Sequence, residues 1–173
     1  RGTARAMHSR IAALLLGLVI ALPAAAQLPS NYSIDTLAST FRQPAALDFL
    51  ADGRVVVAEQ FTGAVKVFAG GAIGTLGNIA PLRVDVISRG LLGLAVDPGW
   101  PLRPYLYTYS SHPGSPGDHR VLRHTVIGAL TSASSTALSL GGSYVVLQGI
   151  PDQNPGNNGG ALINTRGELI GIN

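Results

Sequence analysis

Three short apolar runs, separated by tight-turn signals, occupy residues 44 to 68 and most constrain the fold of this chain. The separators are Asp52-Gly53 and Thr62-Gly63. Asp-Gly supplies the positive φ that a two-residue β-hairpin needs. Residues 55 to 57 are all valine, and β-branched side chains favour a strand that lies between two neighbours. The segment therefore predicts a small antiparallel sheet.

Further strand signals follow along the chain, and several meander units of this kind predict an all-β fold of the β-propeller type. We expect strands at Tyr32 to Ser39, Leu82 to Ile87, Gly90 to Val96, Tyr105 to Tyr109, Arg120 to Val126, Ser143 to Ile150, Gly160 to Asn164 and Glu168 to Ile172. Glycine content predicts a loop at Ala69 to Asn78, Pro and Gly predict another at Ser110 to Asp118, and Gly128 to Gly142 is interpreted as a connection between sheets.

Residues 1 to 26 predict a secretory signal peptide with a few residues upstream of it. Three arginines precede an apolar run from Ile11 to Leu22, and Pro-Ala-Ala-Ala follows at the cleavage positions. Met7 is interpreted as the start. The apolar run of about a dozen residues is shorter than the roughly 20 that span a bilayer. We therefore expect a periplasmic or secreted mature chain, residues 27 to 173, with no membrane association.

The charge balance argues against a nucleic-acid partner. The chain has 12 Lys plus Arg and 9 Asp plus Glu, and three of the arginines lie in the leader, which leaves 9 of each sign. Without a basic cluster there is no electrostatic footprint for phosphate binding. Cysteine is absent, which excludes disulfides, thiolate zinc sites and a cysteine nucleophile.

Several motifs in the mature chain resemble one protein family when they are read in order. QPAALDFLADGRVVVAEQ, RGLLGLAVDPGW, YLYTYSS and HRVLRHTV are similar to the opening blades of the soluble quinoprotein glucose/sorbosone dehydrogenases. The resemblance implies a β-propeller, a sugar substrate, pyrroloquinoline quinone (PQQ) as the electron acceptor and calcium to hold it. At roughly 40 to 50 residues per blade, residues 27 to 173 are expected to form an incomplete β-propeller of about two blades and the start of a third.

The candidate catalytic position lies in VVLQGIPDQNPGNNGGAL, which resembles the family segment that leads into a His-Asn-Gly-Gly turn. The resemblance assigns that His as the general base, and Asn157 stands in its place. An amide cannot accept a proton near neutral pH, so we expect an inactive fragment. Ser88 and Arg89 stand where some members place a cofactor-contacting Gln. They are the candidate cofactor-binding residues, and an ordinary loop role is the favoured alternative.

Other polar residues are interpreted as structural, and no metal ligand is assigned. Asp97 and Glu59 could ligate calcium through oxygen, but a solvated turn carboxylate is the favoured interpretation of both. His119 and His124 have no ligand spacing to a carboxylate. Tyr105, Tyr107 and Tyr109 alternate along one strand face and are interpreted as packing residues.

The C-terminal segment NPGNNGGALINTRGELIGIN also resembles the active-serine segment of the Deg/high-temperature-requirement serine proteases. On that alignment Asn158 replaces the nucleophilic Ser, and no nucleophile remains. Two alternatives therefore stay open beside the dehydrogenase: a non-catalytic propeller that serves as a binding module, and the remnant of a periplasmic trypsin-like serine protease. Under the propeller interpretation an unclosed blade face is apolar and exposed, so we also expect the fragment to self-associate.

Overall fold

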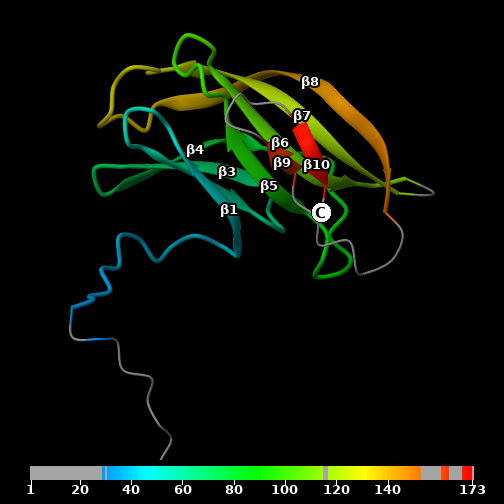
Figure 1. Ribbon diagram of the computed structural model, residues 1–173, viewed down its shortest axis with the longest axis horizontal. Coiled ribbons are helices and arrows are strands. Elements are labelled where there is room, and N and C mark those ends of the chain that lie inside the picture. The colour runs from blue at the N-terminus through cyan, green and yellow to red at the C-terminus, as the bar shows by residue number, and fades with distance from the viewer. Residues whose placement is uncertain (1–28, 30, 115–116, 153–160, 164–168, 173) are drawn as a thin grey trace, which may run out of the picture. The chain divides into compact units, whose positions relative to one another are not determined.

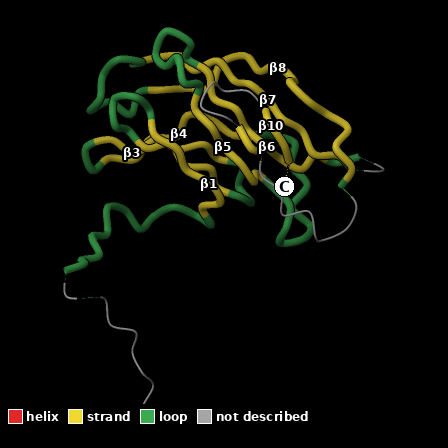
Figure 2. Tube along the Cα trace, in the orientation of Figure 1, coloured by secondary structure: helices red, strands yellow, loops and turns green. Residues whose placement is uncertain are grey.

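The computed structural model describes residues 29, 31–114, 117–152, 161–163 and 169–172. Within these residues the secondary structure consists of β-strands without a helix (Figure 2). Accordingly, no helix in the described part of the chain is long and apolar enough to cross a membrane. The prediction of an all-β chain is confirmed.

The chain divides into two compact units, residues 1–36 and 37–173. Of the first unit, residues 29 and 31–36 are described, and they are irregular apart from a turn in which Tyr32 N donates to Pro29 O at 2.9 Å. The strand predicted from Tyr32 to Ser39 is therefore wrong. Its residues are almost all exposed and pair with no strand, so their alternating pattern has no sheet face to pack on.

The first sheet of the second unit is an antiparallel meander in which sequence neighbours pair (Figure 1). Its strands are β1 (Pro44–Phe49), β2 (Val55–Glu59), β3 (Ala64–Ala69) and β4 (Ala72–Asn78). Hairpin turns form at Asp52-Gly53 and Thr62-Gly63 as predicted, with φ of 88° at Gly53, but residues 50–54 and 60–63 make these connections longer than the two residues expected. The loop predicted over residues 69–78 is wrong, because most of it is β4. Its glycines mark a close approach: a Cβ on Gly74 would lie 2.7 Å from the Thr136 Cβ.

The second sheet has the same order and consists of β5 (Leu91–Val96), β6 (Tyr105–His112), β7 (Asp118–Gly128) and β8 (Leu138–Pro151). Residues 82–87 form no strand and lie in the β4–β5 connection, so that prediction is wrong. Residues 129–137 join β7 to β8 inside this sheet rather than joining two sheets. A separate antiparallel pair, β9 (Ala161–Ile163) and β10 (Leu169–Ile172), follows as predicted. Two four-stranded sheets and the start of a further one agree with the expected partial propeller.

The core lies between the two sheets, where β1 faces β5 and β4 faces β8. Val56, Val65 and Val67 are fully buried on the first sheet, and Leu91 and Leu106 on the second. The apolar runs at residues 55–57 and 91–95 predict burial, which holds for positions 56, 57 and 91. The other positions are half-buried. Val55 is the first residue of β2 and faces away from Val56, on the same side of the strand as the buried Val57.

Candidate functional site

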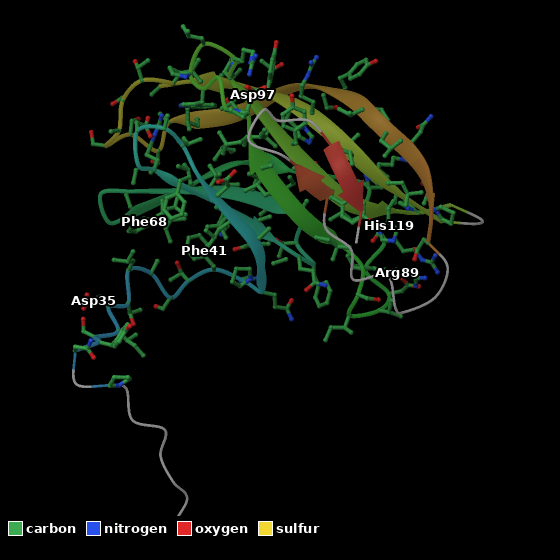
Figure 3. All side chains as sticks on the ribbon, viewed as in Figure 1. Asp35, Phe41, Phe68, Arg89, Asp97 and His119 are labelled. Carbon is green, nitrogen blue, oxygen red and sulfur yellow. The ribbon has the colours of Figure 1, made fainter. Side chains whose placement is uncertain are left out.

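The candidate site lies at the end of the second sheet where β5 and β7 begin and β6 and β8 end. The antiparallel register pairs Leu91 with Ser110 and Asp118 with Pro151, which brings the β4–β5 connection, the β6–β7 turn and the chain after β8 together. In Figure 3, His119 and Arg89 lie beside each other at this end, and Asp97, which follows β5, lies at the other. Residues far apart in sequence therefore meet here.

A buried Arg–Asp pair forms the centre of the site. Arg89 is 8% exposed, and its Nε donates to Asp152 Oδ2 at 2.7 Å. Its Nη1 donates to both carboxylate oxygens of Asp85 at 3.0 Å. The hydrogen bond to Asp152 is the main reason that the pKa of Arg89 is raised. Arg83 Nη1 also donates to Asp152 at 3.2 Å, so two guanidinium groups hold this carboxylate.

His119 adds a third partner to Asp152. Its ring stacks on Tyr109 with centroids 5.2 Å apart, and its Nε2 lies 3.5 Å from Asp152 Oδ1. On the other side, its Nδ1 lies 3.2 Å from Ser111 Oγ. Desolvation by burial lowers the pKa of His119, which favours the neutral ring at neutral pH.

The set Ser111, His119 and Asp152 has the residue types of a hydrolase triad but not its accessibility. Ser111 is 0% exposed, and its Oγ accepts a hydrogen bond from Gly90 N at 3.3 Å. A nucleophile must reach the scissile carbonyl of its substrate, and this hydroxyl cannot. The arrangement therefore ties β6 and β7 to the chain after β8 rather than performing catalysis.

A cleft of about 550 Å³ opens beside this cluster, lined in part by Asp118, Arg120 and Asp152. Arg120 Nε donates to Asp118 Oδ2 at 2.9 Å, and this bond, with one from Gly149 N, lowers the pKa of Asp118. His112 lies nearby and is 3% exposed, with Nε2 3.1 Å from Ser110 Oγ. The charged residues in the cleft wall are thus paired, and glycine and proline form much of the remaining lining.

The structure describes two of the residues singled out from the sequence and leaves the other two outside its described part. Asn157 and Asn158 lie outside the described residues. Ser88 and Arg89 are adjacent in the β4–β5 connection, where Ser88 is half-buried and Arg89 is buried. The guanidinium of Arg89 is compensated by Asp152 and Asp85 within the protein.

The interpretation of Asp97 and Glu59 as solvated turn carboxylates is wrong, since they are 5% and 1% exposed. Asp97 accepts hydrogen bonds from Gly99 N and Arg103 Nε, both at 2.8 Å. Burial alone would raise the pKa of Glu59, but hydrogen bonds from Arg42 N, Thr62 and Lys66 lower it on balance. Both carboxylates stay buried because turn N–H groups and cations satisfy their oxygens.

The sequence analysis did not identify Asp152 and Asp85, although they organise the site. Asp152 lies 63 positions from Arg89, and no local pattern indicates such a pair. The one sequence feature that points to Asp152 is its place directly after Gly149-Ile150-Pro151, in the segment that resembles the dehydrogenase family. Asp and Arg residues in loops at the same sheet end are candidates for such contacts once the strand order is known.

No protein-family model and no curated protein matches the chain. Among solved structures it is similar to an oxidoreductase of Thermus thermophilus described as a glucose dehydrogenase, with 29% identity, a TM-score of 0.56 and coverage of 69% of this chain and 33% of that one. It is also similar in fold to the PQQ-bound aldose sugar dehydrogenase of Streptomyces coelicolor, with 23% identity, a TM-score of 0.58 and coverage of 68% and 34%. The chain spans about a third of the length of each.

Both neighbours are described as sugar dehydrogenases, as the resemblance of the sequence motifs predicts. One of them was solved with PQQ bound. The protease resemblance of the C-terminal segment receives no support from the comparisons.

Proposed function

We propose that this chain is part of an exported, quinone-dependent sugar dehydrogenase of the aldose or sorbosone type, and that it is inactive as it stands. The observation that carries the first part is the likeness to the Thermus glucose dehydrogenase, which covers 69% of this chain at 29% identity. The proposed substrate of the parent protein is a small sugar or related hydroxyl compound. The reaction class is oxidation of its hydroxyl group.

In this proposal the Arg89–Asp152 pair has a structural role. It holds the β4–β5 connection against the chain that follows β8. Asp152 is 2% exposed in its side chain and is held by Arg83, Arg89 and His119. It stands five positions before Asn157, the position that the resemblance assigns to the base. The amide of Asn157 offers no basic lone pair near neutral pH, which supports the absence of turnover.

PQQ and calcium stay implied by the resemblance, and the described residues do not fit them. Arg89 is the candidate cofactor contact, but its charge is compensated by Asp152 and Asp85 inside the protein. Within the described residues no group of three or more His, Asp or Glu side chains could hold a metal ion. We therefore derive no step through either group from these residues.

A second candidate function is a non-catalytic propeller that binds a ligand without turnover. The amide at Asn157, in the position of the base, favours it. The two candidates share a fold and differ only in chemistry. The cleft beside Asp118 and Asp152 is compatible with a polar ligand in either case.

The reading frame beyond the codon for Asn173 tests the proposal for the parent protein. We expect further four-stranded units of roughly 40 to 50 residues each, with basic residues for the cofactor. A peptide-binding PDZ segment at this place would overturn it in favour of the protease. Export is tested separately by N-terminal sequencing of protein from a periplasmic fraction. A mature start at Gln27 supports it, and a chain that keeps residues 1 to 26 in the cytoplasm contradicts it.

A further inference from the structure

A second cleft opens between the two sheets, where the end of β4 meets β7 and β8. Its volume is about 240 Å³, and we call it the β4–β8 cleft. Its lining combines residues that can form side-chain hydrogen bonds with apolar residues: Asn78, His124 and Ser143 with Ile79, Leu122 and Leu140. It is separate from the cleft beside Asp118, because His124 stands six positions after Asp118 on β7, roughly 20 Å along a strand.

His124 is the residue in this cleft that packing alone does not explain. It is 5% exposed and lies on the side of β7 that faces the core, in alternation with Leu122 and Val126. Its Nε2 lies 2.9 Å from Thr108 Oγ1. The other ring nitrogen, Nδ1, makes no hydrogen bond within the described part of the chain, although the ring lines the cleft. A polar ring without a full set of partners costs free energy that an apolar side chain would not.

The charge of the lining favours a neutral ligand. Burial lowers the pKa of His124 to about 4, so the ring is uncharged near neutral pH. The described residues that line the cleft include no Asp, Glu, Lys or Arg. An ionised ligand would therefore lose hydration here without gaining a counter-charge.

The strand register places two hydrogen-bonding side chains side by side in the cleft. His124 and Ser143 are cross-strand partners on β7 and β8, and such partners have Cβ atoms about 4.5 to 5.5 Å apart on one face of the sheet. A neutral imidazole and a hydroxyl can each donate or accept, as alcohol groups do. The volume is below the roughly 300 to 1,000 Å³ of pockets for drug-sized ligands, which limits the occupant to a small molecule.

We propose that the β4–β8 cleft binds a small neutral polyol, with His124 Nδ1 and the Ser143 hydroxyl as hydrogen-bond partners of neighbouring alcohol groups. Leu122 and Leu140 contact the C–H groups of the ligand. The inference is independent of the proposed function, since it assigns no catalytic step to this cleft. It concerns the contact between the two sheets, both of which the structure describes.

An NMR titration of the full chain with xylitol tests the proposal. The ring Cε1–H signal of His124 is identified by its loss in His124→Gln. We expect this signal to shift saturably with xylitol at pH 7.5, while the ring signals of His112 and His119 stay in place. Xylonate, which carries a carboxylate, should leave the signal unshifted. A His124 signal that does not saturate, an equal shift of all three rings, or an equal response to xylonate overturns the proposal.

Two tryptophan variants test the location of the site. Ser143 is exposed, so Ser143→Trp fills the cleft from its mouth, and we expect the saturable shift to disappear. Ser139→Trp is the matched control, because Ser139 is also exposed on β8 but pairs with Ile127, on the opposite face of the sheet. It should leave binding unchanged. Retained binding in Ser143→Trp, or loss in both variants, contradicts the assignment.

The variant Ser143→Ala keeps the test valid if Ser143→Trp does not fold. It removes only the hydroxyl of an exposed side chain, so the fold should be kept, and the urea midpoint measures this. Loss of one hydrogen bond should weaken xylitol binding by a few-fold to roughly tenfold. Unchanged affinity would show that Ser143 does not contact the ligand and would overturn the proposed site.

Discussion

Arg54 shows how one side chain can join the two sheets. Its side chain is 0% exposed and lies just after the β1–β2 turn, where it is paired with Asp52 at 2.7 Å. Its Nη1 donates to the carbonyls of Ala129 and Ser135 and its Nη2 to that of Leu130, at 2.9 to 3.0 Å. A planar guanidinium can satisfy this many acceptors in one plane, and a lysine cannot. The residue therefore connects the first sheet to the β7–β8 loop of the second.

We predict that Arg54→Met lowers the free energy of unfolding by about 3 to 5 kcal/mol, since it removes the guanidinium donors of a carboxylate and three carbonyls. Urea denaturation measures this change. Arg120→Met is the control, because its pair with Asp118 is about a third exposed on the arginine side, and such pairs contribute roughly 0 to 1 kcal/mol. Equal losses in the two variants would show that the buried network is not the stabilising feature.

The buried histidines make stability depend on pH in a definite window. Burial lowers the pKa of His124 to about 4, and its Nε2 lies 2.9 Å from Thr108 Oγ1. The pKa values of His112 and His119 are lowered as well. The unfolded chain takes up these protons near pH 6.5. Stability is therefore lost as the pH falls from about 6.5 toward 4, because protons bind the unfolded state first.

For His124 the loss between pH 7.5 and 4.5 is on the order of 2 to 3 kcal/mol. We predict that His124→Gln, which keeps a polar partner for Thr108, flattens the pH dependence of the urea midpoint over this window. At pH 7.5 the variant should be less stable than the native chain, and at pH 4.5 the gap should narrow. A parallel shift at both pH values would contradict a role of protonation.

At the scale of elements, some turns only reverse the direction of the chain, whereas others also hold the two sheets in contact. Gly53 has φ of 88° in a hairpin with open space around it. Gly90 has φ of 119° directly before β5, and a Cβ there would collide with the backbone oxygen of Gln60. That oxygen also accepts from Leu91 N at 2.8 Å, so the β2–β3 turn and the start of β5 are in direct contact.

We predict that Gly53→Ala costs about 1 kcal/mol, from the left-handed backbone alone. Gly90→Ala adds a collision with backbone and should cost on the order of 3 kcal/mol. Thermal and urea denaturation of the two variants give the comparison. Similar losses would mean that the β2–β3 turn can move away from β5 at little cost.

The sequence predicts most strands of this fold because their turn chemistry and side-chain period are local. It fails for β4 because glycine usually indicates a loop. Here the glycines are needed in a strand, since β4 closely approaches Thr136 and Leu140. It also fails for residues 32–39 and 82–87, where an alternating pattern finds no strand edge to pair with. At the site, the resemblance singles out Arg89 as a candidate cofactor contact, and that role stays a prediction. Asp152 gains its role only from a long-range contact.

At the scale of the whole molecule, the described part of the site is a closed network of charges. Arg89 is compensated by Asp152 and Asp85, Arg120 by Asp118, and His119 is buried. Proton transfer needs a group with an available lone pair or proton within reach of substrate. In this network each carboxylate is held in an ion pair and His119 is buried, so we assign any chemistry to the turn that contains Asn157 and Asn158.

We therefore predict that the purified chain shows no sugar-dependent dye reduction with added PQQ and calcium, and no casein cleavage. Loss of a base removes on the order of 10² to 10⁴ in rate.

Asn157→His tests the assignment of the dehydrogenase base, and Asn158→Ser tests the assignment of the protease nucleophile. We expect Asn158→Ser to stay inactive, because His112, His119 and His124 are at most 5% exposed and cannot activate a serine for an outside substrate. Dye reduction gained only by Asn157→His would place the base at this position, and casein cleavage by Asn158→Ser would restore the protease alternative. Turnover by the unmodified chain in either assay would show that a different residue carries the chemistry.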